Sequence, residues 1–180
     1  MRGRSAESLA KIDAAAEHQL ISFDVYPYTA SSTILREDYI EISKEILITW
    51  SEAIPSARGK KLSELAAEWG CDTTDAMGRL QPGGGIYFNM EDADVARILS
   101  HPRSMVGSDG LPHDAHPHPR LWGTFPRVLG YYVREQRLLG LEQAIHKMTG
   151  LSANTFGLLD RGFLEAGNFA DIVVFDPASI

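Results

Sequence analysis

The 180-residue sequence contains one cysteine, Cys71, so an internal disulfide is excluded. No apolar run approaches the roughly 18 residues of a membrane span. The N-terminal residues also lack the apolar segment of a secretory signal. Seventeen basic residues against 24 acidic ones give a net charge of -7, without a Lys/Arg-rich stripe that would favour nucleic acid. These absences predict a soluble, cytoplasmic protein with no membrane or nucleic-acid partner.

Several catalytic motifs are also missing. No Gly-x-Ser-x-Gly nucleophile motif occurs. The glycines at 83–85 precede an expected strand, which is the wrong order for a phosphate-binding loop. Cys71 lies outside any zinc or redox spacing, which favours a structural role. Any active site must therefore be built from acids, histidines, arginines and hydroxyl groups.

Helices and strands are expected to alternate along much of the chain. Ser5 is a suitable N-cap for a helix reaching about Gln19, and the apolar segment 20–25 then predicts a buried strand. A second strand is expected at 104–107, followed by amphipathic helices at 125–133 and 141–148. This pattern indicates an α/β fold with parallel strands.

Residues 33–85 differ in their pattern of apolar residues from the flanking segments, and this difference predicts a small α+β insert. The segment 40–50 is typical of a half-exposed strand or hairpin. Helices are expected at 62–69, ending at Gly70, and at 74–80. At the other end of the chain, residues 167–176 predict a turn followed by a strand.

Asp109 is the leading candidate for chemistry, because it follows the apolar strand at 104–107. Carboxylates at the C-terminal ends of parallel strands often bind metals or activate water. The alternative is an aspartate that caps its own turn. His113, His116 and His118 come next, but they alternate with prolines, so a proline-stiffened loop lining a pocket competes with metal binding.

Three further residues are candidates for substrate contacts. The forked guanidinium of Arg120 is suited to a carboxylate, although a surface salt bridge is an alternative. Tyr26 follows the first strand and its phenol is able to donate to an oxyanion, unless it simply packs at the strand end. Ser31 and Ser32 lie on the same loop.

Several segments together resemble the N-acyl-D-amino-acid deacylase (D-aminoacylase) family of the amidohydrolase superfamily. The resemblance is carried by residues 24–33 (DVYPYTASST), 47–50 (LITW), 107–114 (GSDGLPHD), 118–127 (HPRLWGTFPR), 147–151 (KMTGL) and 167–177 (GNFADIVVFDP). It extends over essentially the whole chain. The last segment also resembles the general ending of amidohydrolase sequences.

The resemblance implies a zinc-dependent (β/α)8 barrel of which this chain holds the last two βα units. Residues 1–32 would supply a barrel helix and strand seven, 33–85 the insert, 86–157 strand eight and its helix, and 158–180 a strand segment of a small β-sandwich domain. The expected reaction is hydrolysis of an N-acyl-D-amino acid to a D-amino acid and a carboxylate.

The resemblance also assigns roles to individual residues. Asp109 would bind zinc and serve as the acid/base that activates the zinc-bound water, and Tyr26 would polarise the amide carbonyl. Arg120 and Ser32 would hold the substrate carboxylate, with His113 and His118 lining the pocket. The family's remaining zinc ligands do not occur in this sequence.

The missing ligands lead us to expect a truncated or split chain that holds no catalytic zinc by itself. It would need a separate N-terminal barrel portion, or would self-associate through unpaired strand edges. The alternatives are a non-catalytic subunit or pseudoenzyme, and an amidohydrolase that acts on a cyclic amide. Arg120 favours a substrate with a free carboxylate over the cyclic amide.

Overall fold

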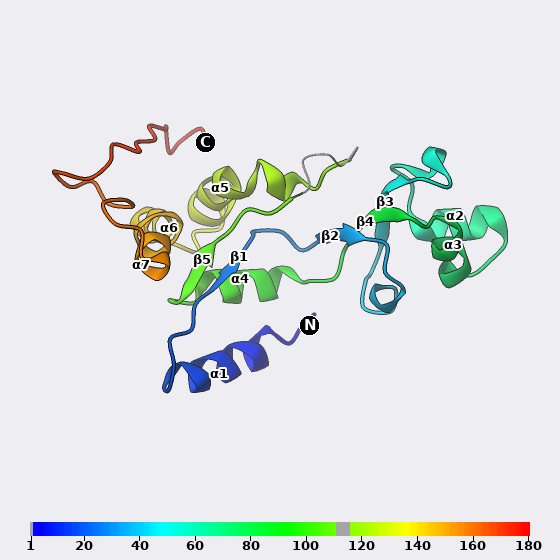
Figure 1. Ribbon diagram of the computed structural model, residues 1–180, viewed down its shortest axis with the longest axis horizontal. Coiled ribbons are helices and arrows are strands. Elements are labelled where there is room, and N and C mark those ends of the chain that lie inside the picture. Colours follow the sequence, from blue (N-terminus) through cyan, green and yellow to red (C-terminus); the bar gives the residue numbers. More distant parts are fainter. Residues whose placement is uncertain (1, 111–115) are drawn as a thin grey trace. The chain divides into compact units, whose positions relative to one another are not determined.

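Residues 2–110 and 116–180 are described by a computed structural model of the chain (Figure 1). They form two units built from interleaved segments. The first unit comprises Met1–Ser5, Tyr28–Asp94 and Asp109–Leu121, and the second comprises Ala6–Pro27, Val95–Ser108 and Trp122–Ile180. The predicted mixture of helices and strands is confirmed. Among the described residues, no helix has the length and apolarity that crossing a membrane requires.

The second unit contains a pair of parallel strands, β1 (Phe23–Val25) and β5 (Ser104–Val106), which lie side by side in Figure 1. Val25 pairs with Val106, and both side chains are buried. The helix α1 (Ser5–Ala16) precedes β1, and α4 (Asp92–Ser100) precedes β5. The predicted order of helix followed by strand is therefore confirmed, and parallel pairing is what such crossover connections permit.

A buried lysine ties helix α6 (Leu141–Met148) to the start of β5. Lys147 is 2% exposed, and its ammonium group donates to the carbonyl of His101 at 2.5 Å. It also donates to the carbonyl of Ser104 at 3.0 Å and to its hydroxyl at 3.2 Å. Burial lowers the pKa of Lys147. The three donors of the ammonium group thus have three oxygen acceptors.

The helix predicted at 125–133 differs in its winding. It begins as α5 (Thr124–Arg127) and continues as a π-helix (Val128–Glu135), in which the amide of Gln136 donates to the carbonyl of Tyr131. The buried residues Val128, Leu129 and Tyr132 follow a spacing that suits both windings, so the sequence pattern does not separate them. A further helix, α7 (Gly150–Phe156), follows α6.

The strand predicted within 167–176 is absent from the second unit. Among the described residues, this segment has no strand partner, and Val173 and Val174 are 83% and 91% exposed. A strand requires a neighbouring backbone to receive its hydrogen bonds. The prediction is wrong for this chain because its β-rich composition has no such neighbour.

The first unit contains an antiparallel sheet in which β4 (Gly83–Tyr87) lies between β2 (Ser31–Ile34) and β3 (Ile46–Ser51). The sequence predicts β3 and part of β4, but it assigns β2 and Gly84 to loops. Gly84 lies in the strand because its backbone pairs with Ile34 of β2 and Trp50 of β3, and its lack of a side chain leaves room for the Trp50 indole. A Cβ atom at position 84 would lie 2.3 Å from Nε1 of Trp50.

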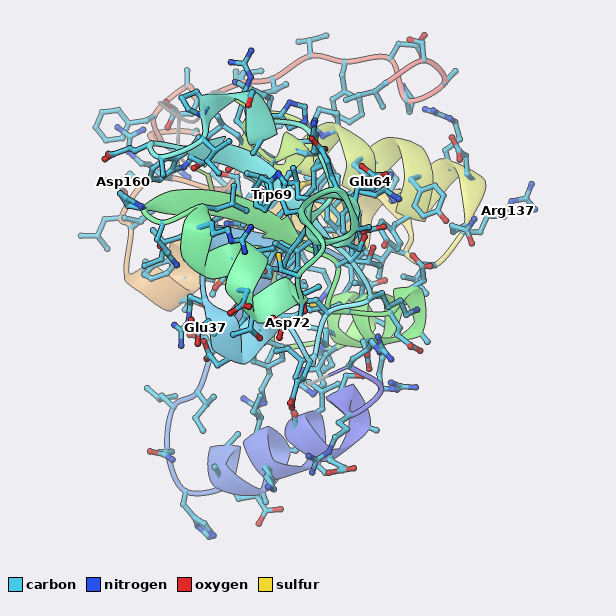
Figure 2. The ribbon with its side chains drawn as sticks, turned by 90° about the vertical axis from the view of Figure 1, so that its right-hand side faces the viewer. Glu37, Glu64, Trp69, Asp72, Arg137 and Asp160 are labelled. Atoms are coloured by element: carbon cyan, nitrogen blue, oxygen red, sulfur yellow. The ribbon has the colours of Figure 1, made fainter. Side chains whose placement is uncertain are left out.

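Two helices pack on this sheet, and both were predicted. Helix α2 (Leu62–Trp69) ends at Gly70, which has the left-handed φ of 62° expected of a residue that ends a helix. Helix α3 (Thr73–Arg79) begins at Asp72, whose carboxylate accepts from the amide of Asp75 at 2.8 Å. Figure 2 labels Trp69 and Asp72 at this junction. The shared core consists of Leu35, Ile46, Ile48, Ala57, Leu62, Leu65, Ala66, Ala76, Met77, Leu80 and Tyr87.

Three single-turn 3-10 helices complete the first unit, at Glu37–Tyr39, Pro55–Ala57 and Pro119–Leu121. The last of them carries Arg120, and residues 111–115 before it lie outside the described chain. This turn and strand β2 position the candidate site.

Candidate active site

Asp109 follows the end of β5 by three residues, as the sequence predicts for a carboxylate beyond a strand. Its side chain is 59% exposed, so solvent or a substrate is able to reach it. Its Oδ2 atom lies 2.8 Å from Nη2 of Arg120. In the described part of the chain this carboxylate forms an ion pair with Arg120. The turn-capping alternative involves the backbone at residue 111, which lies outside the described residues.

Arg120 is the residue that brings the predicted site together. Its side chain is only 5% exposed, so the alternative of a surface arginine is excluded. Besides pairing with Asp109, Nη2 donates to the backbone carbonyl of Ser32 at 3.0 Å. Asp109, Arg120 and Ser32, which the sequence groups only by resemblance, are thus neighbours within the first unit. The Arg120 guanidinium is suited to an anionic ligand only where that ligand displaces the Asp109 carboxylate.

His118 lies directly behind Arg120 and is 4% exposed. Its Nδ1 atom accepts a hydrogen bond from the backbone amide of Arg120 at 3.0 Å. Burial and the positive charge of Arg120 lower the pKa of His118 to about 4, against the opposing effects of the Ala30 backbone and Asp109. The imidazole is therefore neutral at physiological pH, which leaves Nδ1 able to accept.

Tyr28 is a neighbour that the sequence did not single out. Its ring meets the His118 imidazole edge-on, with 5.2 Å between the ring centres and an angle of 88°. Its hydroxyl approaches the carbonyl of Pro119 at 3.5 Å. The only signal in the sequence is the Tyr-Pro-Tyr segment at 26–28, which is equally typical of a packed strand end.

The other predicted site residues stay predictions with respect to this group. Tyr26 follows β1, is half-buried and belongs to the second unit, so its role toward the substrate carbonyl stays a prediction. His113 lies outside the described residues. His116 is exposed.

The described residues do not form a complete metal site. Across 2–110 and 116–180, no three His, Cys, Asp or Glu side chains cluster as a metal site would require. A catalytic zinc usually takes about three protein ligands. Asp109 supplies one ligand at most, and it is paired with Arg120.

Comparison with known proteins identifies the family of this chain. A model of the amidohydrolase family matches residues 57–180. The chain belongs to the amidohydrolase family. The D-aminoacylase of Alcaligenes xylosoxydans xylosoxydans is 54% identical over 178 residues, and an N-acyl-D-aspartate deacylase from the same organism is 56% identical over 178 residues. The resemblance predicted from the sequence motifs is therefore confirmed.

The relatives of this amidohydrolase chain are much longer than the chain itself. The two matches cover 99% of the chain but only 37% and 36% of the relatives, so the chain spans little more than a third of their length. A similar structure is that of N-acyl-D-glutamate deacylase from Bordetella bronchiseptica, complexed with zinc and a phosphonate inhibitor that mimics the tetrahedral intermediate. It has a TM-score of 0.92 and 55% identity, covering 98% of this chain and 37% of that one.

Proposed function

We propose that this chain supplies the substrate-carboxylate and proton-transfer portion of a zinc-dependent amidohydrolase. The reaction is hydrolysis of the amide bond of an N-acyl-D-amino acid, which yields a D-amino acid and a carboxylate. The observation that carries the proposal is the buried Arg120 guanidinium, 2.8 Å from Asp109 and 3.0 Å from the Ser32 carbonyl. Relatives whose names specify D-aminoacylase and N-acyl-D-aspartate deacylase support the substrate class.

Arg120 and Ser32 bind the substrate carboxylate in this proposal. A guanidinium forms two parallel hydrogen bonds with a carboxylate, which fixes its orientation as well as its charge. The substrate then takes the place that Asp109 occupies beside the guanidinium. Because one carboxylate replaces another, the buried cation keeps a partner throughout.

Asp109 transfers the proton. It accepts the proton of the attacking water and delivers it to the nitrogen of the leaving amine, so that the C–N bond breaks with a neutral amine departing. Its 59% exposure allows contact with the reacting atoms once the substrate carboxylate has replaced it beside Arg120. Tyr26 donates a hydrogen bond to the acyl oxygen as negative charge develops there.

Zinc is proposed for the complete protein, because the similar deacylase from Bordetella bronchiseptica contains it. The residues described here do not fit a complete zinc site, since no group of three candidate ligands occurs among 2–110 and 116–180. We therefore assign no step on this chain to the metal. The remaining ligands are proposed to come from parts of a longer protein that correspond to the unmatched portion of the relatives.

The proposal also includes the barrel architecture of the chain. We propose that β1 and β5 are neighbouring strands of a (β/α)8 barrel, with residues 33–85 as an α+β insert between them. The parallel pairing of β1 with β5 supports this proposal, as does the core shared by β3, β4, α2 and α3. Residues 158–180 are proposed to join a small β domain that requires strands from elsewhere.

The test uses a chimera in which this chain replaces its matching 178-residue segment in the Alcaligenes D-aminoacylase. In this chimera, Asp109→Asn removes the proton carrier, and we expect kcat to fall about 1,000-fold. KM should not rise, because the substrate carboxylate no longer has to displace a charged group from Arg120. Arg120→Ala removes the charge that holds the substrate, and we expect KM to rise about 100-fold.

Two exposed residues provide matched controls, namely Glu41→Gln for the loss of a carboxylate and Arg58→Ala for the loss of a guanidinium. Neither control should alter kcat or KM. Full activity in folded, zinc-loaded Asp109→Asn and Arg120→Ala chimeras would show that these residues do not form the site.

A further inference from the structure

His118 holds the backbone of the turn that carries Arg120. Its Nδ1 atom accepts from the amide two residues ahead, at 3.0 Å, and its own carbonyl accepts from the amide of Leu121 at 3.1 Å. The first contact has the geometry of an Asx-turn, in which a side-chain acceptor fixes a turn of its own backbone. Arg120 is thus placed by a side chain that contacts its main chain and leaves its guanidinium to the site.

The imidazole itself is held from the other side. It is 4% exposed and meets the edge of the Tyr28 ring, whose hydroxyl approaches the next carbonyl, that of Pro119. Because the buried ring has a fixed orientation, the Arg120 amide that donates to it is held in a fixed position as well. A displacement of the Arg120 backbone would move the guanidinium away from both Asp109 and the Ser32 carbonyl.

We propose that His118 is a positioning residue for substrate binding, which sets Arg120 at the substrate carboxylate by accepting the Arg120 amide at Nδ1. This inference rests on the proposed function, because it requires Arg120 to bind a carboxylate. Small displacements of a charged fork weaken both of its hydrogen bonds with the bound anion. The residue acts through Arg120 and makes no contact with the substrate.

Two variants of His118 distinguish the role of Nδ1 from that of Nε2. His118→Asn places an amide oxygen near the position of Nδ1 and retains the acceptor for the Arg120 amide. His118→Gln places its polar end near Nε2 and removes that acceptor. In the chimera, with a panel of N-acetyl-D-amino acids as substrates, we expect Gln to raise KM about 10-fold with kcat nearly unchanged. Asn should stay within about twofold of the parent KM.

A double-mutant cycle tests whether the effect passes through Arg120. His118→Gln should add nothing to the KM of the Arg120→Ala chimera. If the two changes multiply, His118 acts independently of Arg120 and the inference is overturned. If Arg120→Ala alone leaves KM unchanged, the proposed function fails. If Arg120→Ala raises KM and His118→Gln does not, only the positioning role fails.

A measurement on the unaltered side chain avoids any dependence on how the glutamine variant folds. In ¹⁵N spectra of the chimera, the His118 resonances, assigned by their loss in His118→Asn, should show an unprotonated Nδ1 and a protonated Nε2 at pH 7. A proton on Nδ1 would contradict the inference, because that nitrogen would then be unable to accept the Arg120 amide.

Discussion

Arg120 is a buried cation, and a buried cation needs a permanent partner because desolvation is costly without one. In the structure that partner is Asp109, with the Ser32 carbonyl as a second acceptor. An incoming substrate carboxylate satisfies the same requirement, so binding exchanges one anion for another. In the proposed function, this exchange would also free Asp109 for proton transfer and would link substrate binding to the availability of the base.

His118 predicts a dependence of stability on pH. Burial, followed by the positive charge of Arg120, lowers the pKa of His118 from 6.5 to about 4. Between these two values, the unfolded chain binds a proton at His118 and the folded chain does not. The stability is therefore fully present above about pH 6.5 and is lost as the pH falls toward 4. Linkage gives a loss of about 2 kcal/mol between pH 7.5 and pH 5.

The matched variant for this measurement is His118→Asn, which keeps the hydrogen-bond acceptor and does not titrate. Unfolding in urea at pH 7.5 and pH 5 compares it with the parent chimera. The parent should lose more stability than the variant on acidification. An equal loss in both proteins would assign the pH dependence to other groups.

A buried lysine links elements of the second unit through three hydrogen bonds to uncharged oxygen atoms. Lys147 of α6 donates to the carbonyls of His101 and Ser104 and to the hydroxyl of Ser104, where α4 gives way to β5. These contacts place α6 against the start of the strand that leads to Asp109. Burial lowers the pKa of Lys147, which reflects the cost of keeping this charge inside the protein.

Lys147→Met is expected to destabilise the protein by about 2 kcal/mol, because it removes the donor from buried oxygen atoms. Lys11→Met, on the exposed face of α1, is the control and should change stability little. Urea unfolding of both chimeras measures the difference. An unchanged or raised stability for Lys147→Met would mean that apolar packing at this position outweighs the three hydrogen bonds.

Sequence reasoning worked best where local chemistry determines the structure. Helix α2 and its end at Gly70 follow from apolar spacing and a left-handed glycine, both of which are local. The predictions that the structure contradicts concern features that depend on residues far away in the sequence. Gly84 lies in a strand because its backbone pairs with Ile34 and Trp50, and residues 167–176 form no strand because no strand of the described chain pairs with them.

The candidate site also combines features that the local sequence predicts with features that it does not. Asp109 is recognisable from its position after an apolar strand, whereas no local pattern specifies its ion pair with Arg120. The contact of His118 with the Arg120 amide spans two residues, yet a proline-rich segment with three histidines gives no sign of which ring is buried. Tyr28 was missed because a strand-end tyrosine has no distinctive pattern.

Over the chain as a whole, several large apolar side chains are almost fully exposed. Leu159, Leu164, Val173 and Val174 are each more than 80% exposed, and the chain spans little more than a third of its relatives' length. Apolar side chains with such exposure favour association. Both observations agree with a polypeptide whose proposed activity requires strands and metal ligands supplied by additional protein.

The direct test of the proposed function is hydrolysis of paired N-acetyl-D- and N-acetyl-L-amino acids by the chimera with the Alcaligenes D-aminoacylase. We predict turnover of the D-substrates, little turnover of the L-substrates and loss of activity in Asp109→Asn. A folded, zinc-loaded chimera that hydrolyses neither enantiomer, or that keeps its activity in Asp109→Asn, would contradict the assignment.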